Sequence, residues 1–175
     1  MMLHVVTTLE SDDEVAQSAL DRLNFDAMAQ LEAQRLFAIA FAILRDSGEA
    51  EDATQETFLN AWRRWDTLRD PLLRRPWLTR ICVNHCINSR KRLLRRLFTP
   101  IPDTASAPPQ GPGFDADRDR AMAHLSPDQR AVVALHFAWG YTLEECAALL
   151  DVPVGTVRSR LSRGLATLRQ EMTSD

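Results

Sequence analysis

The stretch from Tyr141 to Gly164 places the tightest limit on what this chain can form, because its pattern predicts two short helices joined by a tight turn. Thr142 and Glu145 have the spacing of a capping box at the start of the first helix, and Pro153 suits the first turn of the second. Ala147 supplies a small side chain where two helices cross closely. The stretch is therefore predicted to be a helix-turn-helix.

The second of these helices has one apolar face and one polar, cationic face. Its apolar side chains recur at helical spacing, namely Val154, Val157, Leu161, Leu165 and Leu168. Hydroxyl and guanidinium groups lie opposite them or at the edge, namely Thr156, Arg158, Ser159, Arg160 and Arg163. Such a helix can bury one side and offer the other to the phosphates and base edges of a DNA major groove. A solvated surface helix would show the same charges, which leaves that interpretation open.

Charge is distributed unevenly along the chain. The net charge is −3, but residues 1–56 carry 12 acidic and 3 basic side chains, whereas residues 63–96 carry 11 basic and 2 acidic ones. The second helix of the helix-turn-helix adds another basic segment. Two separated basic segments favour a nucleic acid that is contacted at two places.

A segment rich in Pro, Gly and Ser, residues 98–117, divides the chain. It is predicted to be an extended linker because it can neither hold a helix nor pack a core. We expect an all-α fold with two small helical domains, residues 25–97 and 118–172, after an acidic N-terminal extension over residues 1–24. No segment alternates as a strand would.

The first domain reads as three helices, over residues 25–44, 49–65 and 76–97. In the second helix Phe58, Trp62 and Trp65 are predicted to form the buried stripe. The third helix has a predicted core stripe of Leu78, Ile81, Cys82, His85 and Leu93. Its other stripe could stack on unpaired bases and hold phosphates, and consists of Trp77, Arg80, Asn84, Asn88 and Lys91. Taken alone this stripe could equally be plain surface, but the basic run over residues 90–96 favours nucleic acid.

Other classes of protein find little support in the sequence. Cys82, His85 and Cys86 share one helical turn but have no fourth ligand nearby, so we expect buried side chains and no metal or cofactor. A redox role for Cys146 is the lesser alternative to simple burial. No arrangement suits catalysis. The apolar runs are shorter than a membrane span, no export signal precedes them, and cysteines are few, so a cytoplasmic protein is expected.

Four segments, taken in order, resemble the extracytoplasmic-function sigma factors of the sigma-70 family, which are promoter-specificity subunits of bacterial RNA polymerase. Residues 50–62 (AEDATQETFLNAW) resemble the region 2 signature, and residues 75–84 (RPWLTRICVN) resemble the promoter-melting helix. Residues 125–136 (LSPDQRAVVALH) and 154–161 (VGTVRSRL) resemble region 4. The resemblance covers nearly the whole chain, from about Phe25 to Met172.

The resemblance implies roles for particular residues. The residues implied to dock on the clamp helices of the polymerase's largest subunit are Asp52, Gln55, Glu56, Leu59 and Arg63. Those implied at the −35 element are Thr156, Arg158, Ser159, Arg160 and Arg163. Those implied at the −10 element are Arg74, Arg75, Trp77, Arg80, Asn84, Asn88 and Lys91, with the loop from Leu68 to Arg75 helping to capture a flipped base. Further implied partners are the polymerase flap, promoter DNA and an anti-sigma factor.

Two other functions remain as alternatives. A stand-alone helix-turn-helix regulator would bind duplex operators without polymerase, but would carry a ligand pocket or phosphoacceptor fold in place of the first domain. A module that only titrates another protein would not need the basic face of the last helix. The sequence favours the sigma factor over both.

Overall fold

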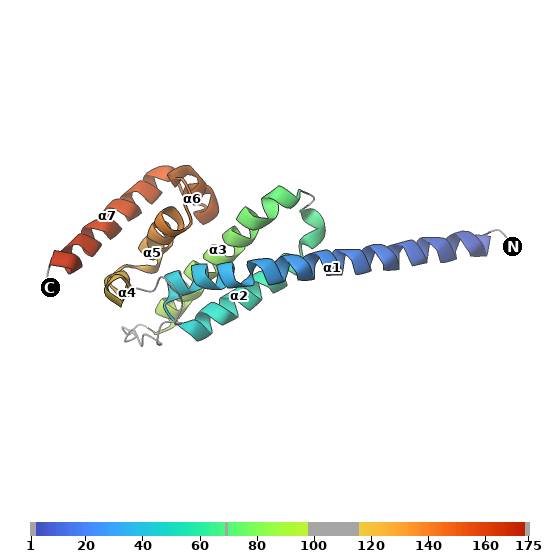
Figure 1. The fold of residues 1–175 in the computed structure, drawn as a ribbon, viewed down its shortest axis with the longest axis horizontal. Coiled ribbons are helices and arrows are strands. Elements are labelled where there is room, and N and C mark those ends of the chain that lie inside the picture. The colour runs from blue at the N-terminus through green and yellow to red at the C-terminus, as the bar shows by residue number, and fades with distance from the viewer. Residues whose placement is uncertain (1–2, 69, 98–115, 174–175) are drawn as a thin grey trace. The chain divides into compact units, whose positions relative to one another are not determined.

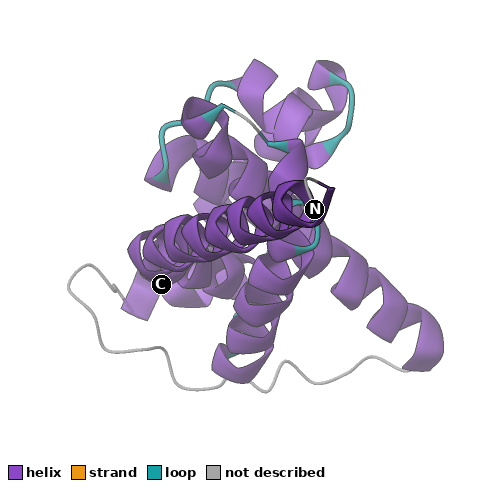
Figure 2. Cartoon of the chain, turned by 90° about the vertical axis from the view of Figure 1, so that its right-hand side faces the viewer, coloured by secondary structure: helices purple, strands orange, loops and turns teal. Residues whose placement is uncertain are grey.

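In a computed structural model the structure describes residues 3–68, 70–97 and 116–173, most of which are helical; side chains are described for 19–68, 70–89, 120–171 and 173. Figures 1 and 2 show helices joined by short loops. The long helices are α1 (Leu3–Leu44), α2 (Ser47–Trp62), α3 (Arg74–Leu97) and α7 (Val154–Thr173). The shorter ones are α4 (Ala116–Ala123), α5 (Pro127–Val133), α6 (Leu143–Leu150), η1 (Trp65–Thr67), η2 (Pro71–Leu73) and the π-helical turn η3 (Ala134–Ala138). The predicted all-α class is confirmed.

Helix α1 begins at Leu3, well before the predicted start at Phe25. Its C-terminal part belongs to the core, since Leu36, Ile39 and Ile43 are fully buried. Within the described residues, Ala19–Leu44 is long and apolar enough to cross a membrane, with a mean hydropathy of 1.3, although a core helix satisfies the same criteria. One helix that meets these criteria is weak evidence for a membrane span.

Helix α2 packs through small side chains. Ala50, Ala53, Thr57 and Ala61 are 0–1% exposed, and Thr57 satisfies its buried hydroxyl by donating to the Ala53 carbonyl at 2.7 Å. This narrow face lets α3 approach closely. The predicted stripe was therefore wrong in part: of its three aromatic residues only Trp65 is buried, Phe58 is half-buried, and the exposed Trp62 lies off the inner face.

Helix α3 buries Leu78 and Cys82, as the spacing predicted. Thr79 is also fully buried, and its hydroxyl receives a hydrogen bond from Arg35 Nη1 at 3.0 Å while donating to the Arg75 carbonyl at 2.9 Å. These contacts fix the start of α3 against α1. Ile81 and His85, predicted to be core, are only half-buried, and Leu93 lies outside the residues whose side chains are described. Of the predicted linker, residues 98–117, residues 98–115 lie outside the described residues and the last two begin α4.

The C-terminal helices begin with two capping boxes. Thr142 Oγ1 accepts from the Glu145 amide at 3.1 Å, and the Glu145 carboxylate accepts from the Thr142 amide at 2.7 Å, as predicted. Ser126 and Gln129 form the same arrangement at α5. Helix α6 ends at Asp151, whose φ of 54° is in the left-handed region and turns the chain toward α7.

The packing face of α7 differs from the predicted one. Val157 is fully buried, and Gly164 lies so close to α5 that a Cβ placed on it would be 3.2 Å from Val133 Cγ2. The inner line of α7 therefore runs through Val157, Arg160 and Gly164. Leu161 and Leu165 are only half-buried, which corrects their assignment to the apolar core stripe. The helix turns in this way because a glycine permits a closer approach to α5 than a leucine would.

Candidate nucleic-acid interface

A groove of about 530 Å³ runs along α3 and the end of α2. It brings together four residues that the sequence predicted to share one stripe of α3, namely Trp77, Arg80, Asn84 and Asn88. Lys91, predicted beside them, lies outside the residues whose side chains are described. An aromatic ring, two amides and a guanidinium around one groove can stack on an unpaired base and hydrogen-bond its edges.

The opposite wall of this groove contains residues that the sequence analysis missed. Asn60 and Arg64 come from the end of α2 and the turn after it, and Ile81 and His85 from α3 complete the lining. The four-residue spacing of Asn60 and Arg64 was a usable signal, since it places both on one side of α2. His85 was missed because its spacing assigned it to the core.

The cations in the first turns of α3 are held in different ways. Arg74 stacks on the Trp65 ring, with its guanidinium carbon 4.6 Å from the ring centroid, and Arg75 is exposed. Arg80 is about half exposed and lies 3.5 Å from the carboxylate of Asp151 at the end of α6. An exposed pair at this distance is weak and leaves the Arg80 guanidinium available to a phosphate.

A second cationic face, in addition to the one on α3, lies on helix α7 of the helix-turn-helix. Arg158 is exposed and lies 3.5 Å from Glu144, while Arg163 donates from Nη2 to Ser159 Oγ at 3.2 Å. Ser159 in turn donates to the Thr156 carbonyl at 2.9 Å. Arg160 differs from its neighbours: its side chain is only 17% exposed and its Nη2 lies 3.0 Å from Asp128 Oδ1 on α5.

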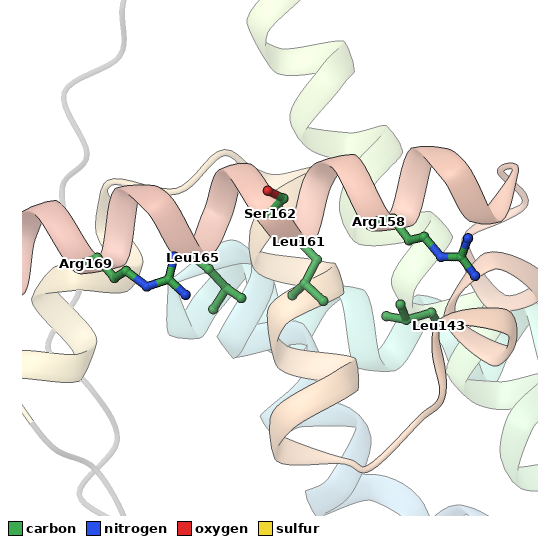
Figure 3. A pocket seen from close by; sticks show the side chains of 6 residues that line it. All are labelled: Leu143, Arg158, Leu161, Ser162, Leu165 and Arg169. Carbon is green, nitrogen blue, oxygen red and sulfur yellow. The ribbon is translucent and has the colours of Figure 1, made fainter.

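A smaller groove of about 270 Å³ lies between α6 and α7 (Figure 3). Leu143, Leu161 and Leu165 form its apolar part, and Arg158 and Arg169 lie along its length. The predicted core leucines of α7 therefore line an open groove beside the cationic face. Leu161 and Leu165 lie on one apolar stripe as predicted, but they are half-buried where full burial was expected.

The residues predicted to dock on polymerase share one exposed face of α2. All five are exposed, namely Asp52, Gln55, Glu56, Leu59 and Arg63. Trp62, 40% exposed on the same helix, adds apolar surface there that the sequence analysis had placed in the core. This face combines charge, amide and apolar groups, which suits a protein partner.

The cysteines and histidines form no metal centre among the described residues. Cys82, Cys86 and Cys146 are fully buried, and burial raises the pKa of the Cys146 thiol to about 11. A buried thiol with a raised pKa is a poor nucleophile at neutral pH. The structure thus gives no support to a reactive Cys146.

Comparison with known proteins places these features in a family. The sigma-70 region 2 family matches residues 28–96, and the sigma-70 region 4 family matches residues 119–168. The ECF RNA polymerase sigma factor SigM of Mycobacterium tuberculosis is 32% identical over 162 residues, which cover 90% of this chain and 83% of that relative. A probable RNA polymerase sigma factor, RfaY of Xanthomonas campestris, is 35% identical over 147 residues, which cover 77% of this chain but only 37% of that relative.

A solved structure shows the same likeness. The sigma factor RpoE, in complex with the anti-sigma factor NepR from Bartonella quintana, superposes with a TM-score of 0.72 and 28% identity over 87% of this chain and 98% of that chain. The fold and the pair of helices α6 and α7 define a helix-turn-helix protein. The chain belongs to the sigma-70 family and, within it, to the extracytoplasmic-function group.

Proposed function

We propose that this chain binds bacterial core RNA polymerase and directs initiation at promoters by reading a −35 and a −10 element. The observation that carries the proposal is that one chain holds both a groove on α3, lined by an aromatic ring, amides and a guanidinium, and a helix, α7, with a cationic face. The chain would act without catalysis of its own, because the polymerase supplies the chemistry. Its site of action would be the cytoplasm, where the polymerase works.

At the −35 element, α7 would enter the major groove. Arg158 and Arg163 are exposed on α7 and Ser159 is half-buried between them, and Thr156, at the start of the helix, would lie near the phosphate backbone. Guanidinium groups suit guanine edges and phosphates alike, so these side chains can supply both affinity and base preference. The exposed pair of Arg158 with Glu144 is weak enough to yield to DNA.

At the −10 element, the α3 groove would receive bases of the opened strand. Trp77 offers a stacking face, and Asn84 and Asn88 offer amides to base edges. Arg74, Arg75 and Arg80 would hold phosphates, and Lys91 stays a predicted member of this set. Strand opening costs unstacking energy, which these contacts would offset only where the sequence fits the groove.

Polymerase would supply what neither DNA-binding part has alone. Each part offers few contacts, but two modules on one chain raise each other's effective concentration when both elements lie at the right spacing. Docking on polymerase would fix that spacing. The exposed face of α2, with Leu59 and Gln55 near its centre, would bind the clamp helices, and the chain would also bind the polymerase flap. The free chain is therefore expected to bind promoters poorly.

Run-off transcription from a promoter library, with core polymerase and the full chain, tests this proposal. Asn84→Ala and Arg163→Ala should each lower specific transcription about tenfold, as expected for loss of one base or phosphate contact. Gln30→Ala and Arg22→Ala, exposed amide and guanidinium side chains on α1, serve as matched controls and should change nothing. No specific transcripts, together with tight duplex binding without polymerase, would instead identify a stand-alone regulator.

A second proposed partner is an anti-sigma factor. The support is likeness to the RpoE structure, in which that sigma factor is bound to the anti-sigma factor NepR. We expect a protein that purifies with this chain in equal amount and abolishes the specific transcripts when added back. A co-purifying protein that leaves transcription unchanged would contradict this expectation.

A further inference from the structure

Arg160 lies on the inner line of α7, between two residues that pack against the rest of the helix-turn-helix. Val157 is fully buried one turn before it, and Gly164 approaches α5 one turn after it. The three residues follow one another at steps of three and four, so they share one face of the helix. Arg160 thus belongs to the face that packs on α5, in contrast to Ser159 beside it.

Asp128 is the partner that lets a guanidinium occupy this face. It stands in the first turn of α5, after the Ser126 cap, and its carboxylate oxygen lies 3.0 Å from Arg160 Nη2. The two side chains are 17% and 27% exposed. An ion pair so far withdrawn from water is screened little by salt.

The other ion pair of α7 behaves differently. Arg158 and Glu144 are 63% and 69% exposed and 3.5 Å apart. Arg158 can leave its partner and turn to DNA at little cost. For Arg160 to reach a base it would have to leave Asp128, and the 3.0 Å contact between α5 and α7 would be lost.

We propose that Arg160 and Asp128 form a clip that sets the position of α7 on α5, so that Arg160 is a positioning residue for −35 recognition and reads no base itself. This inference rests on the proposed function, and it assigns base reading to Arg158, Ser159 and Arg163 alone. It also gives Asp128, which the sequence analysis passed over, a part in promoter recognition. An acidic residue on α5 thereby supports a cationic helix that meets an anionic ligand.

The test is transcription by reconstituted polymerase from promoters randomised across the −35 element, using the full chain. Arg160→Ala and Asp128→Ala should each lower transcription about tenfold from every promoter alike, which corresponds to about 1.4 kcal/mol. The order of preferred bases should not change. Asp128→Asn keeps the shape of the side chain and should show the same uniform loss. It replaces Asp128→Ala in the test if the alanine variant folds poorly.

The double variant Asp128→Ala with Arg160→Ala sharpens the result. If the two residues act as one clip, the double variant should be no worse than either single variant. Arg163→Ala serves as the comparison, because loss of a base-reading residue should relax preference at one base pair. Relaxed preference with Arg160→Ala but not with Asp128→Ala would overturn the inference and return Arg160 to the base-reading residues.

Failure of the proposed function would show itself separately, as a lack of specific transcripts with the unaltered chain. The clip would then be tested by urea unfolding of the unaltered chain, the variants Arg160→Ala and Asp128→Ala, and the double variant. Non-additive losses of unfolding free energy in the two single variants would support it. Strictly additive losses would reject it.

Discussion

Helices α3 and α7 both carry cations toward the proposed nucleic acid, yet their sequences foretold their faces unequally well. In α3 two of the residues predicted for the core, Leu78 and Cys82, are buried while Ile81 and His85 are half-buried, and four residues of the predicted polar stripe lie around one groove. In α7 the predicted apolar stripe is rotated, so that Leu165 lines an open groove while Arg160 turns inward. The same rule of helical spacing was applied to both.

The difference comes from what each helix packs against. The inner face of α3 packs against α2, whose buried side chains are small, and Leu78 on α3 is fully buried. The inner face of α7 meets α5 at a glycine, where the closest contact is made by a residue with no side chain. Helical spacing counted over large apolar residues alone does not predict the contact of Gly164 with α5. It also cannot see that Asp128, 32 residues earlier in the sequence, provides a place for Arg160.

The largest effect is expected at the inner face of α3. Leu78→Ala should lower the free energy of unfolding by about 3 kcal/mol, because it removes a fully buried side chain and leaves a cavity. Leu72→Ala, at an 85% exposed leucine just before α3, is the matched control and should change it by less than ~0.5 kcal/mol. Urea unfolding of the full chain measures both. Equal losses would mean that the inner face of α3 is misplaced.

The contact of α7 with α5 is tested next by Gly164→Leu. The added side chain would meet Val133 at the crossing and should cost about 2 kcal/mol of unfolding free energy. At Gly155, near the start of the same helix, an added Cβ meets nothing within 4 Å, so Gly155→Leu should be neutral or stabilising through helix propensity. A stable Gly164→Leu variant would show that α7 does not approach α5 as closely as described.

The rotation of α7 gives a smaller expected difference. Leu165→Gln should lower the free energy of unfolding by less than ~1 kcal/mol, because Leu165 is half-buried beside an open groove. Val157→Ala, on the inner line, should cost about 2 kcal/mol. Urea unfolding of the two variants side by side settles the order. The reverse order would restore the face that the spacing predicted.

The smallest effect concerns pH at the start of α6. Hydrogen bonds from the Thr142 amide and hydroxyl hold the pKa of Glu145 below its ordinary value of 4.5. A depressed pKa in the folded state means that the stabilisation is present above the unfolded pKa and is lost as pH falls through the folded pKa. Glu145→Gln should therefore make thermal unfolding less sensitive to acidification below about pH 4.5. Glu51→Gln, an exposed residue of α2, should leave that sensitivity unchanged.

Much of the fold and part of the candidate site could be predicted from the sequence. The capping box of Thr142, the helix over Pro76 and the shared groove of Trp77 and Asn84 all follow from local chemistry and spacing. The second wall of that groove, with Arg64, could not be predicted so directly, because it depends on how α2 packs on α3. Local sequence fixes where helices begin, while contacts between helices decide which face is turned inward.

The packing of α2 through its alanines has a consequence for the solubility of the chain. The inner face takes the small side chains, so bulkier ones are left in water, with Leu59 50% and Trp62 40% exposed. Adjacent exposed apolar side chains of this size favour self-association when no partner covers them. Light scattering of the purified chain should thus rise with concentration, and Leu59→Lys should suppress that rise. Because the exposed face of α2 suits docking on a partner, the chain alone should be less soluble than the chain bound to that partner.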